Sequence, residues 1–90
     1  MFIIKETMIA LGTDKNSHYR QKGMVSVGYY GKDNHYFGNA LPSKYALKDH
    51  SFTNKVSAQI ALESRRTLRE VIGKILGIDF TFEVLEVDAE

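Results

Sequence analysis

Two kinds of apolar pattern follow one another along the chain, one typical of strands and one typical of a helix. Four runs are rich in β-branched and aromatic residues, which favour strands: residues 2–11, 24–30, 35–40 and 79–87. The second and third runs flank Gly31-Lys32-Asp33-Asn34, whose residue types suit a tight reversal of the backbone. These two runs are therefore predicted to form a β-hairpin.

Residues 54–76 have apolar side chains at helical spacing and are predicted to form a long helix. Thr53 or Asn54 is a suitable N-cap, and Gly77 follows where a left-handed residue often ends a helix. One broad stripe of this helix is expected to face the interior. Its residues are Val56, Ile60, Ala61, Leu68, Val71, Ile72 and Ile75.

The order of elements is β-β-β-α-β, which predicts an α+β fold. We expect an antiparallel sheet of about four strands with one helix packed across one face. The first and last strands have apolar residues on both faces, as an inner position favours, so they are expected to be neighbours. Residues 44–48 are predicted to form a short extended continuation of the hairpin.

Composition places the chain among ordinary globular domains. With 90 residues, 43% of them hydrophobic, residues 1–90 are expected to form a single domain. The chain has no cysteine, and a small domain that lacks disulfides is typical of a reducing compartment. No leader peptide or membrane-spanning run is evident, so the protein is expected to be cytoplasmic.

Candidate catalytic chemistry is sparse, and the chain is predicted not to be an enzyme and to need no metal or cofactor. We find no nucleophile elbow, P-loop or dinucleotide-binding motif. Three histidines each lie within four residues of an aspartate: His18, His35 and His50, beside Asp14, Asp33 and Asp49. They are expected to be solvated on three separate turns, and an enzymatic role would require the imidazoles to converge.

A second stripe of the predicted helix suggests a protein interface, because leucine and mid-helix glycine are unusual choices for a face in water. This stripe, with Arg66 at its margin, consists of Ala58, Leu62, Arg65, Arg69, Gly73 and Leu76. The first hypothesis is therefore a non-enzymatic binding module that contacts a protein through this stripe. The partner would be a second copy of the chain, most simply in a homodimer. Alternatively, the chain would be a phage or mobile-element accessory protein, and its partner the host protein that it masks.

The alternative hypothesis is nucleic-acid binding, in which aromatic side chains stack on bases and basic side chains neutralise phosphates. The candidate contacts are Tyr19, Arg20, Lys22, Tyr29, Tyr30, Lys32, Arg66 and Arg69. In its order of elements alone, three strands followed by a helix, the chain resembles the AP2-like arm-binding domains of phage integrases. A net charge of only +1 argues against a strong polyanion binder.

Overall fold

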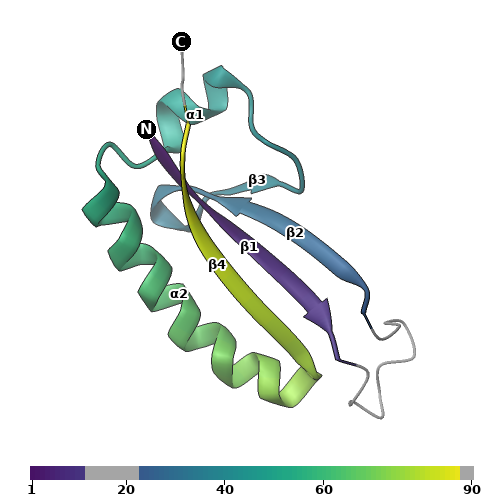
Figure 1. The fold of residues 1–90 in the computed structure, drawn as a ribbon. Coiled ribbons are helices and arrows are strands. Elements are labelled where there is room, and N and C mark those ends of the chain that lie inside the picture. The colour runs from purple at the N-terminus through teal and green to yellow at the C-terminus, as the bar shows by residue number, and fades with distance from the viewer. Residues whose placement is uncertain (12–22, 88–90) are drawn as a thin grey trace.

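The structure, a computed structural model, describes residues 1–11 and 23–87. Four strands, β1 (Phe2–Ala10), β2 (Val25–Tyr30), β3 (Tyr36–Gly38) and β4 (Ile78–Glu86), form one antiparallel sheet. A long helix, α2 (Lys55–Leu76), precedes β4 and packs mainly against β4 and β1 (Figure 1). The predicted α+β fold and its β-β-β-α-β order are confirmed.

The strand order in the sheet is β3-β2-β1-β4, so the first and last strands of the chain are neighbours. Ile4 of β1 pairs with Tyr30 of β2 on one side and with Val84 of β4 on the other. Strand β1 is therefore paired along both edges. This inner position agrees with the prediction from its apolar residues on both faces. The expectation that the two terminal strands lie side by side is confirmed.

A short 3-10 turn, Lys32–Asn34, connects β2 to β3 and confirms the predicted hairpin. Asp33 and Asn34 both have positive φ angles, 57° and 59°. Asp and Asn are the residue types other than glycine that tolerate this left-handed region best. The reversal therefore depends on the residues that predicted it.

One element differs from the prediction. Residues 44–48 are not extended; they lie within a helix, α1 (Lys44–His50). Ser43 is its N-cap and accepts a hydrogen bond from the Ala46 amide. Lysine, alanine and leucine are good helix formers, and burial of Leu47 anchors the short helix to the domain. The prediction was wrong because seven residues are too few for a clear helical period.

Helix α2 begins and ends where the sequence predicts. The Asn54 side chain accepts a hydrogen bond of 2.8 Å from the Ser57 amide, which makes Asn54 the N-cap. Gly77 adopts the left-handed conformation at the other end, with φ 68° and ψ 42°. Both ends are thus fixed by local interactions, in agreement with known capping preferences.

The rotation of α2 about its axis, however, is nearly opposite to the expected one. Ala58 and Leu62 are buried, and with Ile4 and Phe52 they form the main hydrophobic cluster. Most of the stripe expected to face inward is instead exposed to solvent: Val56, Ile60, Leu68, Val71 and Ile75. Ala61 and Ile72 are half-buried at its edge. The prediction of which helix face is buried was therefore wrong.

Gly73 lies on the buried face of α2, at a close approach between α2 and β4. A Cβ atom added there would lie 2.5 Å from the Ile78 carbonyl oxygen and 3.2 Å from the Phe80 ring. Glycine at this position thus permits close helix–strand packing within the protomer. Its cost to helix formation, about 1 kcal/mol relative to alanine, is offset by that packing.

Replacement of Gly73 by alanine is expected to lower the free energy of unfolding by about 1–3 kcal/mol, because the new methyl group overpacks the contact. Urea denaturation followed by circular dichroism measures this change. Gln59→Ala, at an exposed position of the same helix, is the control and should be nearly neutral. A Gly73→Ala variant more stable than the wild type would contradict the close contact.

Candidate functional site

Five aliphatic side chains project from one flank of α2 into solvent, and we call them the outer stripe: Val56, Ile60, Leu68, Val71 and Ile75. Their exposed fractions range from 59% to 72%. Spacings of three, four and eight residues place them on the same side of a helix that turns once every 3.6 residues. The outer stripe faces away from the sheet, since the buried residues Ala58 and Leu62 lie on the opposite flank.

A groove runs along the edge of the outer stripe, between α2 and the end of β2. Ile60, Ser64 and Leu68 line it from the helix, and Tyr30 lines it from the sheet. The groove is open to solvent and has a volume of about 600 Å³. The groove therefore combines apolar side chains with polar ones, Arg65 among them.

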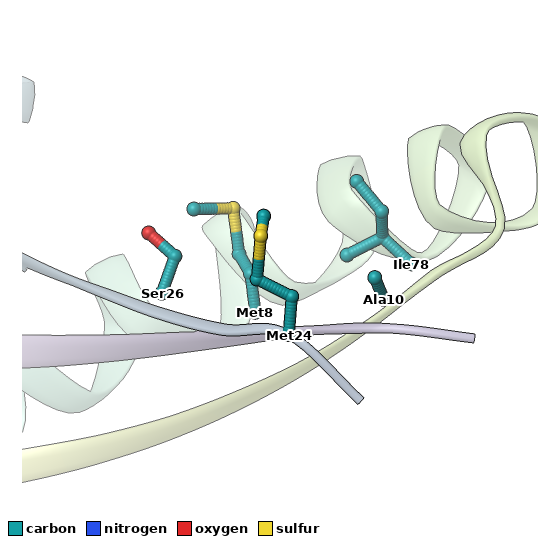
Figure 2. Close-up of a pocket in the computed structure, with 5 residues that line it drawn as sticks. All are labelled: Met8, Ala10, Met24, Ser26 and Ile78. Atoms are coloured by element: carbon teal, nitrogen blue, oxygen red, sulfur yellow. The ribbon is translucent and has the colours of Figure 1, made fainter. Parts of the chain in front are cut away.

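A second, smaller hollow lies near the start of β2. Figure 2 shows its five lining side chains, all rising from the face of the sheet on which α2 lies: Met8, Ala10, Met24, Ser26 and Ile78. Because α2 packs mainly against β4 and β1, the β2 half of this face receives less cover from the helix. Both hollows thus border the less covered half of the sheet.

The outer stripe leaves apolar surface of several aliphatic side chains in contact with water. Complete burial of a Val, Leu or Ile side chain stabilises a protein by about 1.5–3 kcal/mol. Five such side chains, each about two-thirds exposed, therefore leave on the order of 5–10 kcal/mol of burial unrealised in the protomer. The largest contiguous apolar patch on the surface of a soluble protein is often a functional surface.

The inner flank of α2 meets a buried charge on the sheet. Glu6, in the middle of β1, is only 1% exposed. Its carboxylate accepts a 3.3 Å hydrogen bond from Nε of Arg69 and lies 3.7 Å from a guanidinium nitrogen of Arg65. The Arg65 guanidinium also lies 3.5 Å above the Tyr30 ring. A buried carboxylate needs such partners, and here both come from the inner flank of α2.

The structure thus places the residues of the predicted protein interface mostly inside the protomer. Ala58, Leu62 and Gly73 are buried, and Arg65 and Arg69 contact Glu6. Leu76 is half-buried, and Arg66 forms a 2.9 Å ion pair with Glu63. The flank assigned to a partner therefore packs against the protein's own sheet.

The outer stripe is the surface that sequence reasoning missed. A signal for it was present, because a lone acidic residue, Glu6, interrupts an apolar strand, and Arg65 and Arg69 are spaced four apart on the helix. Residues at that spacing share a helix face, so both can reach one carboxylate. A prediction that included this pairing would have placed the flank with Arg65 and Arg69 against the sheet.

The residues of the nucleic-acid hypothesis do not form one surface in the described part of the chain. Tyr29 and Tyr30 are consecutive residues of β2 and point to opposite faces of the sheet. Lys32 lies in the 3-10 turn, and Arg66 and Arg69 pair with carboxylates. Tyr19, Arg20 and Lys22 lie outside the described residues.

Two of the three histidines come together, contrary to the expectation of separate solvated turns. The rings of His35 and His50 stack with centroids 3.6 Å apart and planes 4° from parallel, and Phe37 lies edge-on beside them. His18 lies outside the described residues. The in-plane lone pairs of two parallel rings do not converge on one ion, and no cluster of potential metal ligands occurs among residues 1–11 and 23–87.

Comparison of the chain with protein-family models, curated proteins and solved structures found no match. Neither α1 nor α2, the two α-helices of the described ranges, has the length and apolar character needed to cross a bilayer.

Proposed function

We propose that this chain is a protein-binding module that uses the outer stripe of α2 as its contact surface. The observation that carries the proposal is the exposure of five aliphatic side chains in a line on one helix flank, next to a groove. An apolar helix flank matches the apolar flank of a partner helix, since both lose contact with water on association. The proposed role is thus binding, without a chemical reaction.

The chemistry of this surface favours a protein over a nucleic acid. The outer stripe contains no basic side chain that could neutralise a phosphate. Two of the arginines of α2, Arg65 and Arg69, contact the buried Glu6, and removing them from it would leave a charge unpaired. Exposed aliphatic side chains stabilise a complex only when another apolar surface covers them.

The contacts that hold α2 on the sheet come from residues outside the outer stripe. Helix α2 is held by burial of Ala58 and Leu62, by the cap at Asn54 and by the contacts of Glu6. Residues of the outer stripe can therefore be changed without removing those interactions. This separation of stability from binding makes the proposal testable by substitution.

A photo-reactive side chain in the outer stripe is expected to capture the partner. We would replace Leu68 with p-benzoylphenylalanine and irradiate cells that naturally make the protein. The benzophenone inserts into C–H bonds of a surface that covers it, so a covalent protein adduct is the expected product. Electrophoresis and mass spectrometry would identify the adduct and the residue attacked.

The matched control places the same reagent at Gln59, which is exposed on the polar flank of the same helix. Adducts from position 68 but not from position 59 would support the proposal. Equal labelling from both positions, or no adduct from position 68, would show that the outer stripe is not a docking surface. Nucleic acid cross-linked at position 68 would likewise contradict a protein partner.

A further inference from the structure

We propose that the occupant of the outer stripe is a second copy of this chain, with two α2 helices packed antiparallel about a two-fold axis. This inference rests on the proposed function and names its partner. The sheets would lie on the outside, because each helix presents the flank that faces away from its own sheet. The resulting dimer has four layers in the order sheet, helix, helix, sheet.

Four of the five residues of the outer stripe follow a symmetric pattern of residue types; Leu68, whose symmetric counterpart is Glu63, does not. When positions are counted inward from the two ends of the helix, Val56 corresponds to Ile75, and Ile60 corresponds to Val71. Ser64 and Thr67 correspond to each other at the middle. A two-fold axis makes every contact occur twice, residue i with j and j with i. An antiparallel pair centred between Ser64 and Thr67 therefore places β-branched side chains against β-branched side chains at both ends.

The centre of this pattern suits the closest approach of two helices. Ser64 and Thr67 are small, and small side chains let helix backbones come close. The Thr67 hydroxyl donates a 3.0 Å hydrogen bond to the Glu63 carbonyl, so this polar group keeps a partner when water is excluded. Leu68, beside the centre, would pack over the partner's Ser64, a large side chain against a small one.

The length and direction of the contact are consistent with helix pairing. Val56 and Ile75 are 19 residues apart, which corresponds to about 28 Å along a helix axis. Contact over that length requires a shallow crossing angle of about 20°, the common geometry of helix pairs and four-helix bundles. The antiparallel direction also places each positive helix end beside a negative one.

The area is sufficient for a dimer. A fully exposed aliphatic side chain offers on the order of 120 Å² of apolar surface, so each residue of the outer stripe exposes about 80 Å². Ten of these side chains in two copies would bury roughly 800 Å² of apolar surface. Apolar atoms make up about 65% of a homodimer interface, so complete burial gives a total of about 1,200 Å², the lower end of the range of stable complexes.

Engineered cysteines test the partner and its direction, because the wild-type chain has none and any disulfide must come from the new residues. A mixture of Val56→Cys and Ile75→Cys chains is expected to form a disulfide-linked dimer, with twice the 10.2 kDa mass of one chain. Each variant alone should stay unlinked, because like positions would lie about 28 Å apart. Non-reducing electrophoresis after mild oxidation gives the result.

Sedimentation equilibrium of the wild type and of Ile60→Glu supplies the second measurement. The wild type is expected to be a dimer, and Ile60→Glu should raise the dissociation constant at least about 100-fold, because two unpaired carboxylates would be buried. The neighbouring Gln59→Glu, on the polar flank, should leave the dissociation constant unchanged.

Two outcomes would overturn the antiparallel self-pairing. A wild-type chain that remains monomeric at about 1 mM, the weakest dissociation constant for which a dimer would be expected to form, would exclude a second copy as the occupant. Efficient linking of Val56→Cys chains to one another would indicate a parallel pair. If the wild type is monomeric, the cross-link from position 68 would identify another protein; if the pair is parallel, the partner is still a second copy. The proposed function stands in both cases.

Discussion

Replacement of Leu62 by alanine is expected to lower the free energy of unfolding by about 2–5 kcal/mol, whereas Leu68→Ala should change it by less than about 1 kcal/mol. Both residues are leucines of the same helix, six positions apart. Leu62 is 2% exposed and packs in the main hydrophobic cluster, but Leu68 is 59% exposed. Truncation of Leu62 leaves a cavity, while truncation of Leu68 removes atoms already in water.

Urea denaturation at low micromolar concentration measures both variants where association contributes least. A loss of stability in Leu68→Ala that appears only at high protein concentration would report the proposed interface. The helix orientation described above would be wrong if Leu68→Ala proved the more destabilising of the two at low concentration. The comparison therefore tests the rotation of α2 and, through it, the position of the outer stripe.

Replacement of Glu6 by glutamine is the second large prediction and should cost about 3 kcal/mol of stability. The change keeps the shape of the side chain but leaves Arg65 and Arg69 without the carboxylate that they contact. Their side chains are 10% and 26% exposed, so the uncompensated charge is largely out of water. The expected cost is at the lower end for a broken buried ion pair because Arg69 reaches some solvent.

A triple variant is the control for this result. Glu6→Leu, Arg65→Met and Arg69→Met together remove all three charges and keep similar side-chain volumes, which is often neutral or stabilising for a buried ion network. The triple variant is therefore expected to recover most of the stability lost in Glu6→Gln. A Glu6→Gln variant as stable as the wild type would mean that the ion pairs do not fix the rotation of α2.

The sequence by itself determined those features of this protein that depend on neighbouring residues. The strand runs, the reversal at Asp33 and Asn34, the N-cap at Asn54 and the left-handed Gly77 were all predictable, because capping and turn preferences act within a few residues. The pairing of the two terminal strands was also predictable from their apolar residues on both faces. These features gave the fold class and the order of elements.

The sequence contains the charged residues, but only the tertiary structure decided which flank of α2 is buried, because Glu6 lies more than fifty positions from the arginines that it contacts. An apolar stripe normally turns inward, but here Glu6 on the sheet needs cationic partners, and the flank that carries Arg65 and Arg69 provides them. Tyr30 and Phe80 then cover the guanidinium groups with aromatic rings. The more aliphatic flank is left in water as the proposed docking surface, since one helix cannot bury two opposite faces against a single sheet.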